Sequence, residues 1–223
     1  GAWRKAERVA DRACLVKLRD GSLAIGRNFP QKHNGRSTRS TYERLPHKRT
    51  CARPGRKRVP AITVEAVAFR RPGEDGDYAW QLEQAAYNNK LHIYNENIVD
   101  QRNQCTFPGA GNACARPYRP EGKSIGMPTG TVIGYRALDE LVLGTETAKD
   151  TIDAALSEIA EHILRHPGRF DTILYCVNER DDRKLIGCGT FHVDLDVRAY
   201  ITEGIQKLPQ TVAQLYESRR ARG

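Results

Sequence analysis

The sequence lacks long hydrophobic segments. No apolar run approaches the roughly 20 residues that a helix needs to cross a bilayer, and the first residues lack the apolar core of a secretory signal. These absences predict no membrane partner and an intracellular protein, located in the cytoplasm or packaged in a particle. With 39% hydrophobic and 28% charged residues, the composition is typical of a globular protein.

Several common chemical motifs are also missing. None of the six cysteines belongs to a CxxC pair, so neither a zinc ribbon nor a thioredoxin-type site is indicated. HExxH is absent, and no Ser-His-Asp or Cys-His set can be assembled around Cys188. We therefore expect small buried thiols in a reducing compartment and no metal or other cofactor. The sequence carries no pattern that sets an oligomeric state.

Positive charge is concentrated in the first quarter of the chain. Residues 1–60 contain 17 Lys and Arg against 4 Asp and Glu, whereas the remaining 163 residues contain 19 against 23. Such a segment favours binding to nucleic acid or another polyanion, although a solvated extension has the same composition. The candidate nucleic-acid-binding residues are Arg49, Arg53, Arg56, Lys57 and Arg58.

Local patterns divide the chain into three parts. Alternating apolar and polar residues around Asp20-Gly21 predict a β-hairpin over residues 13–29. Residues 30–60 show no periodicity and predict an extended arm that is ordered only by contact with a partner. The predicted parts are a basic hairpin and arm over 1–60, an α/β domain over 61–210, and a basic tail over 211–223. A second short helix over 209–223 is the alternative to a tail.

The α/β domain alternates strands and helices. Asp77 is expected to cap the first helix, and a strand, a helix and a second strand in succession favour a sheet with helices packed against it. Trp80, Leu82, Ala85 and Ala86 are expected in the core. The predicted strands span residues 62–69, 91–95, 172–177 and 185–191, with another ending at Pro128-Thr129-Gly130, and the predicted helices span 77–88, 147–166 and 197–207.

A glycine loop follows the strand that carries Asn95 and Asn97. Its residues, 109–113, read Gly-Ala-Gly-Asn-Ala. Glycines let backbone N–H groups surround an anion, because no Cβ blocks the approach. Neutral amides beside them can orient a sugar hydroxyl or a water without repelling a phosphate. The loop therefore predicts a pocket for a phosphate-bearing ligand.

A second glycine loop, residues 186–191, also follows a strand and reads Ile-Gly-Cys-Gly-Thr-Phe. Ligands of open α/β sheets lie beyond the carboxyl ends of the strands, so the two loops could hold a diphosphate between them. Phe191 would then stack on a sugar or base. Tight turns and a core aromatic are the alternative interpretation. Arg116 and Arg119 are expected either to pair with a ligand phosphate or to form surface salt bridges.

The order of these strands, helices and glycine loops along the chain resembles that of the macrodomain family. The resemblance is nearest to the branch that removes ADP-ribose from nucleic acid. The similarity covers about residues 91–210. Gly130 stands where that branch has a lysine, and Pro117 limits any helix after the first loop to about one turn. The matching segments are residues 93–97, 109–113, 128–130, the helix over 151–163, the strand over 173–177, and 186–189.

The resemblance implies a three-layer α/β/α fold, with a mixed sheet and helices on both faces, that binds ADP-ribose or a related nucleotide. Hydrolysis would place the ribosyl C1 near Asn97 and a water, with Asn95 as the second candidate catalytic residue. The implied ligand-binding residues are Gly109, Ala110, Gly111, Asn112, Thr129, Gly187, Cys188, Gly189, Thr190 and Phe191.

Three functions stay open at this point. The protein could bind ADP-ribose alone, or it could also act as an ADP-ribosyl hydrolase that removes this group from a macromolecule. Alternatively, it is a structural or packaging protein, viral or ribonucleoprotein, which binds nucleic acid through its basic arm and has an inactive α/β scaffold.

Deleting residues 1–60 is expected to remove salt-dependent binding to nucleic acid. An arm that neutralises several phosphates of duplex DNA gives a plot of log K against log salt with a slope of roughly −0.9 per contact. Anisotropy titrations of a labelled duplex at several salt concentrations, with the full chain and the deletion variant, measure this slope. Full affinity after the deletion would contradict the prediction.

Overall fold

The computed structural model describes residues 14–17, 23–26 and 61–222, except 188 and 190. The chain divides into two units, residues 1–53 and 54–223. In the first unit, β1 (Cys14–Lys17) pairs antiparallel with β2 (Leu23–Gly26). The residues that join β1 to β2 lie outside the described residues, and so does the predicted arm. The hairpin and the arm therefore stay predictions.

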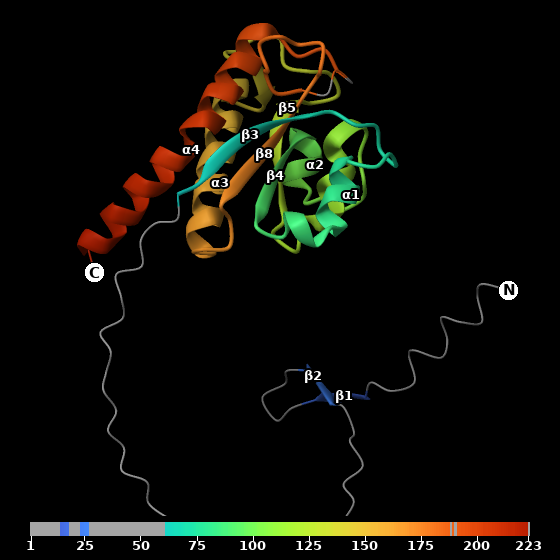
Figure 1. Cartoon of the computed structure of the whole chain (residues 1–223), viewed down its shortest axis with the longest axis vertical. Helices are drawn as coiled ribbons and strands as arrows, with labels where there is room; N and C mark the ends of the chain where they lie inside the picture. The colour runs from blue at the N-terminus through green and yellow to red at the C-terminus, as the bar shows by residue number, and fades with distance from the viewer. Residues whose placement is uncertain (1–13, 18–22, 27–60, 188, 190, 223) are drawn as a thin grey trace, which may run out of the picture. The chain divides into compact units, whose positions relative to one another are not determined.

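The second unit is built on a four-stranded sheet (Figure 1). The strand order is β3 (Thr63–Ala68), β8 (Thr172–Val177), β4 (Lys90–Asn97) and β5 (Ser124–Gly130), and each neighbouring pair is parallel. The predicted α/β fold is thus observed, but the described sheet is parallel rather than mixed. The reason is that each strand returns to the sheet through a helical connection, which brings the next strand back in the same direction.

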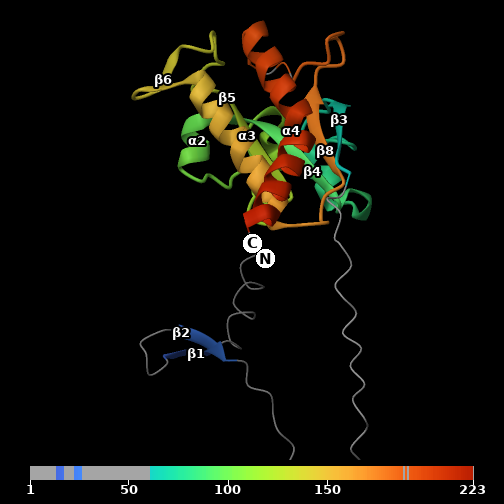
Figure 2. The ribbon, with the colours of Figure 1, turned by 90° about the vertical axis from the view of Figure 1, so that its left-hand side faces the viewer.

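Alternate side chains of the strands enter two buried clusters, because successive residues of a strand point to opposite faces. Leu91 and Ile93 of β4 belong to the cluster that includes residues of α3 (Ala148–Arg165) and α4 (Leu195–Arg222). Tyr94 belongs to the other, with residues of α1 (Tyr78–Glu83). In Figure 2, α3 and α4 lie in front of the strands. Helices therefore pack against both faces of the sheet.

The remaining elements are short. Among them, β6 and β7 pair antiparallel, outside the main sheet. No helix among the described residues is long and apolar enough to span a membrane. The bounds are η3 (Ala85–Tyr87), α2 (Ile98–Arg102), η4 (Gly111–Tyr118), β6 (Leu141–Leu143) and β7 (Glu146–Thr147).

Helix α3 confirms the prediction from hydrophobic spacing. The Thr147 hydroxyl accepts a hydrogen bond from the Asp150 N–H at 3.1 Å, and the Asp150 carboxylate accepts from the Thr147 N–H at 2.9 Å. This capping box starts the helix. Ile152 and Ile159 are fully buried on its apolar face, and the helix ends two residues before Pro167.

The helix predicted over residues 77–88 is shorter than expected. Asp77 caps α1 as predicted, accepting from the Trp80 N–H at 2.6 Å. The helix ends at Glu83 because Gln84 has extended backbone angles, φ −86° and ψ 134°. Of the residues expected in the core, Leu82 is buried, whereas Trp80, Ala85 and Ala86 are exposed.

The helices around Pro117 and Pro209 are both longer than predicted. The 3₁₀-helix η4 spans eight residues rather than about one turn, and Pro117 lies near its end. Helix α4 continues through Pro209 to Arg222, where a helix end at 207, followed by a second short helix or a tail, was expected. A proline removes one donor from a helix, but Leu208 and Val212 are buried on either side of Pro209. Packing of these side chains on the core keeps the helix continuous.

Replacing Val212 with alanine is expected to lower the free energy of unfolding by about 1–3 kcal/mol, because a buried side chain is truncated. Gln214→Ala, at an exposed position of the same helix, is the matched control and should stay within about 0.5 kcal/mol of wild type. Urea denaturation measures both. Equal stabilities of the two variants would show that residues 211–222 do not pack as described.

Candidate functional site

Two cavities adjoin the carboxyl ends of β4, β5 and β8. The small cavity has a volume of about 160 Å³, and the large cavity has a volume of about 520 Å³. Asn95, Thr129 and Phe191 line both. The first glycine loop borders the small cavity through Gly109 and Ala110. The second glycine loop borders the large cavity through Gly187 and Gly189. The structure therefore brings the two loops to one edge of the sheet.

Asn112 ties the first glycine loop to strand β4. Its amide nitrogen donates to the side-chain oxygen of Asn95 at 2.8 Å, and its oxygen accepts from the Asn95 backbone N–H at 3.0 Å. Asn112 is buried, whereas Asn95 is half-buried at the cavity wall. The pair fixes the Asn95 amide and leaves its Nδ2 donor without an acceptor among the described residues.

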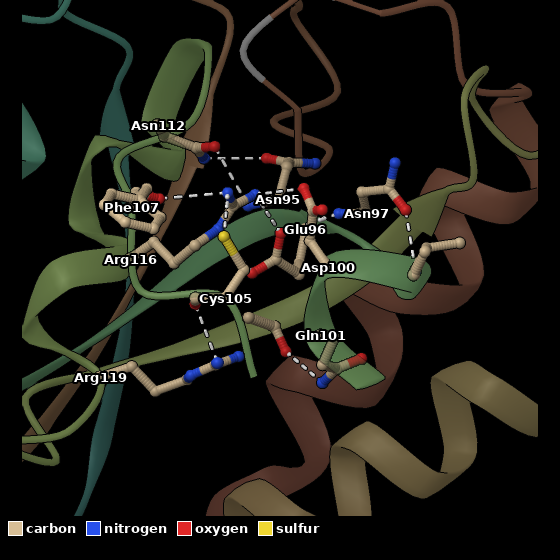
Figure 3. Close-up of polar contacts among 12 residues, drawn as sticks. Asn95, Glu96, Asn97, Asp100, Gln101, Cys105, Phe107, Asn112, Arg116 and Arg119 are labelled. Carbon is tan, nitrogen blue, oxygen red and sulfur yellow. Dashed lines mark hydrogen bonds and ion pairs between the residues drawn. The ribbon is translucent and has the colours of Figure 1, made fainter. Parts of the chain in front are cut away.

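Asn97 has a structural role that the sequence did not indicate. Its side-chain oxygen accepts from the Val99 N–H at 2.8 Å and so caps helix α2. Its Nδ2 points away from this bond (Figure 3). An amide nitrogen can donate a hydrogen bond but cannot take a proton. Asn95 and Asn97 can therefore orient a ligand oxygen, but neither can act as a base.

A buried ion pair, drawn in Figure 3, contributes to the lining of the small cavity. Arg116 donates from Nη2 to Glu96 Oε1 at 2.5 Å and from Nε to Glu96 Oε2 at 3.1 Å. Nη2 also lies 3.0 Å from an oxygen of Asp100. The Glu96 side chain is fully buried, and that of Asp100 is 41% exposed. Arg116 is therefore held by two carboxylates instead of pairing with a ligand phosphate.

The remaining donors of Arg116 are also used within the protein. Its Nη1 donates to the carbonyl oxygen of Phe107 at 3.1 Å and approaches the Cys105 sulfur at 3.6 Å. Burial opposes the charge of this side chain, but the hydrogen bonds and charge of Glu96, together with Asp100, outweigh burial and raise the pKa of Arg116. The guanidinium thus stays charged in its buried position.

Glycines make room for this ion pair. A Cβ at Gly109 would lie 3.0 Å from Arg116 Nη2 and 2.8 Å from the side chain of Ala113. A Cβ at Gly126 would lie 2.8 Å from the Cβ of Glu96. The first glycine of the loop is therefore required by packing as well as by any approach of a ligand.

Other predicted residues lie elsewhere. Gly111 is buried at the first position of η4, has a φ of +61°, and lines neither cavity. Arg119 donates to the Cys105 carbonyl at 2.9 Å and lines a separate cavity beside α3. Cys188, Thr190 and the predicted nucleic-acid-binding residues Arg49, Arg53, Arg56, Lys57 and Arg58 lie outside the described residues.

The second glycine loop is not the strand predicted over residues 185–191. Gly187 makes an isolated parallel bridge with Val177, and its N–H donates to the Cys176 carbonyl at 2.9 Å. Gly187 and Gly189 have φ of +135° and +78°, which interrupts extended pairing. A Cβ at Gly189 would lie 2.8 Å from the Asn178 side-chain nitrogen. The glycines let this segment run closely beside the end of β8.

Charged side chains hold the wall of the large cavity together. Asp181 pairs with Arg198 of α4, which also donates to the Ile186 carbonyl at 2.7 Å. Burial alone would raise the pKa of Asp181, but the hydrogen bond and charge of Arg198 lower it. Arg180 lines the same cavity and is exposed. Its guanidinium is therefore accessible to an anionic ligand.

A tight turn over residues 130–134 covers one side of the small cavity. A Cβ at Gly130 would lie 2.3 Å from the Ile133 carbonyl oxygen, and one at Gly134 would lie 2.0 Å from the His192 carbonyl oxygen. No side chain fits at either position. The turn presents Val132 at 85% exposure and Ile133 at 54% exposure, close to Phe191 in the cavity lining. Apolar side chains exposed around a polar pocket are typical of a binding site.

Glu96 and Asp100 line the small cavity but were not among the site residues predicted from the sequence. Glu96 stands between the two asparagines that were singled out, but no sequence spacing links it to Arg116, twenty positions further along the chain. The available signal in the sequence was the carboxylate of Glu96, because an acidic side chain is unexpected in a pocket that was predicted to bind an anion. No group of His, Cys, Asp and Glu suited to a metal ion occurs in the part of the chain that the structure describes.

Comparisons with known proteins give no relative. No family model, curated protein or solved structure matches this chain.

Replacing Arg116 with methionine is expected to lower the free energy of unfolding by about 3–5 kcal/mol, because the buried Glu96 carboxylate loses its partner. The double variant Arg116→Met/Glu96→Leu should regain much of this loss, since both charges are removed. Arg119→Met is the control and should cost less. Urea denaturation measures all three, and a cost below about 1 kcal/mol for Arg116→Met would refute the prediction.

Proposed function

We propose that this protein binds ADP-ribose or a related diphosphate nucleotide at the carboxyl edge of its sheet. The observation that carries the proposal is the junction of the two cavities at Asn95, Thr129 and Phe191, with a glycine loop on either side. Nucleotides bind parallel α/β sheets at this edge. We also propose that the helices on the two faces correspond to macrodomain-like layers.

The small cavity suits a sugar. Its volume of about 160 Å³ is the space of about five waters, which fits one sugar ring but not a whole dinucleotide. The Nδ2 donors of Asn95 and Asn97 suit hydroxyl oxygens. Asp100 supplies an acceptor for hydroxyl protons at the same wall. Sugars need this mixture of donors and acceptors around one ring.

The large cavity suits the diphosphate. The described ionisable residues of the small cavity include one more acid than base, namely Glu96 and Asp100 against Arg116. In the large cavity basic side chains outnumber acidic ones, because Arg180, Arg198 and His192 line the wall with Asp181. Arg198 is already paired, so Arg180 is the side chain that would bind phosphate. The exposed Phe191 stands between the two parts.

A direct test is isothermal titration with ADP-ribose, AMP and ribose 5-phosphate. We expect ADP-ribose to bind the full chain, and Phe191→Ala to weaken binding about tenfold through loss of an aromatic contact of about 1.4 kcal/mol. Phe191 is 58% exposed, so its removal should leave stability unchanged, and Leu141→Ala, at 70% exposure outside both cavities, is the control. If wild type gives neither heat nor a thermal shift with ADP-ribose, the proposal is abandoned.

We propose separately that the N-terminal segment binds nucleic acid. The support is its composition, 17 basic against 4 acidic residues over 1–60. The two proposals are compatible, since the segment would deliver the cavities to a modified nucleic acid. In that case ADP-ribose attached to DNA or RNA is the ligand.

A further inference from the structure

We infer that the cavity beside α3 binds a short extended peptide, which adds a further strand to the free edge of β5. This cavity, called the edge cavity below, is lined by segments of α2, β5 and α3. Its volume of about 520 Å³ is within the usual range of ligand sites. It shares no lining residue with the two cavities at the carboxyl edge of the sheet. The inference is therefore independent of the proposed nucleotide site.

Strand β5 presents half of its backbone groups away from the sheet. It lies at one end of the described sheet, beside β4. Successive residues of a strand direct their N–H and C=O groups to alternate sides. The His92 N–H donates to the Lys123 carbonyl at 3.1 Å, so Lys123 and Ile125 face β4. Ser124 and Gly126 therefore face away from it.

These outward groups lack partners. Ser124 is fully buried, and neither its N–H nor its carbonyl has a hydrogen-bond partner in the part of the chain that the structure describes. The same holds for the N–H of Gly126, whose carbonyl accepts from the Gln101 side chain at 3.1 Å (Figure 3). An unpaired buried backbone group costs about as much as a lost hydrogen bond. Ser124 and Gly126 both line the edge cavity, so a strand bound there would supply the missing partners.

The rest of the β5 edge is closed. Pro128 occupies the next outward position and has no N–H to donate. Beyond it, the Thr129 carbonyl accepts from the Tyr135 N–H at 2.9 Å. The open part of the edge is therefore short, and residues of α2 and α3 line the cavity beside it. This arrangement suits a single short segment better than the edge of another sheet.

Arg119 favours an acidic side chain in this segment. It donates to the Cys105 carbonyl at 2.9 Å (Figure 3), but no carboxylate among the described residues forms an ion pair with it. Arg102 also lines the cavity but is already bound to both oxygens of Glu146, at 3.0 and 2.8 Å. Glu158 of α3 lines the cavity too, so a single acidic residue suits it better than a uniformly acidic segment.

The other lining groups favour apolar and uncharged side chains. Ile98 and Ala155 contribute apolar surface. His162 donates from Nε2 to the Gly122 carbonyl at 2.9 Å, and burial lowers its pKa, so it adds no charge at neutral pH. In strand addition, main-chain hydrogen bonds supply affinity and pockets for alternate side chains supply specificity. The partner that fits is an extended segment with apolar residues and one Asp or Glu that reaches Arg119.

The test selects short random peptides, displayed on phage, against the immobilised full chain. We expect enriched sequences to combine apolar residues with one Asp or Glu. A labelled synthetic copy of an enriched peptide should bind wild type in anisotropy titrations, and ADP-ribose should not displace it. Absence of enrichment over the bare support overturns the inference and leaves the nucleotide proposal untouched.

Three variants locate the bound peptide. Ala154→Trp should weaken binding at least tenfold, because the indole fills the edge cavity from an exposed position of α3. Ser157→Trp, at an exposed position of the same helix outside all three cavities, is the matched control. Arg119→Gln should weaken binding about tenfold, and a peptide with the amide in place of its acid should not show this difference. Equal affinities of wild type and Ala154→Trp overturn the inference.

Amide NMR of the full chain distinguishes strand addition from binding through side chains alone. On addition of the peptide, we expect the amide protons of Ser124 and Gly126 to move downfield as they gain hydrogen bonds. The amide proton of Ile125 already faces β4 and should move little. Unchanged signals of Ser124 and Gly126 overturn the inference. A dimer of the full chain that Ala154→Trp dissociates would assign the edge cavity to a second copy and would overturn it as well.

Discussion

The buried pair of Arg116 and Glu96 is the interaction on which the rest of the site depends. Two charges in an apolar interior are costly unless each is fully bonded. Arg116 meets this condition by contacting strand β4, helix α2 through Asp100, and the Phe107 carbonyl. The pair thus fixes three segments relative to one another. The positions of Asn95, Asn97 and Asp100 in the small cavity follow from that arrangement.

The glycines of the site serve this constraint first. Gly109 and Gly126 leave the space that Arg116 and Glu96 occupy, and Gly130 and Gly134 permit the tight turn that lines the same cavity. A glycine-rich loop is commonly interpreted as an anion cradle. Here the same residues are required by packing, so their presence alone does not identify a ligand. The support for nucleotide binding comes instead from the cavities and from the donors that face them.

Local patterns predicted much of the backbone. Helix α3 and strand β8 were predicted because an apolar stripe of helical spacing and a continuous apolar run are local signals. The loop after β8 and the length of α4 were predicted wrongly. Gly187 has a positive φ and makes only an isolated bridge with Val177. Pro209 stays within a helix because Leu208 and Val212 are buried. Both outcomes depend on contacts with distant parts of the chain, which no local pattern contains.

The sequence by itself determined the class of the fold, the edge of the sheet at which the glycine loops gather, and the division between a basic segment and a slightly acidic remainder. Only the tertiary structure decided which polar groups are available there. In the folded protein Arg116 pairs with Glu96, the Asn97 side-chain oxygen caps helix α2, and Asp100 stays partly exposed. The reason is physical: hydrogen-bond partners are chosen by proximity in space, and residues 96, 100 and 116 become neighbours only when the sheet and its helices have packed.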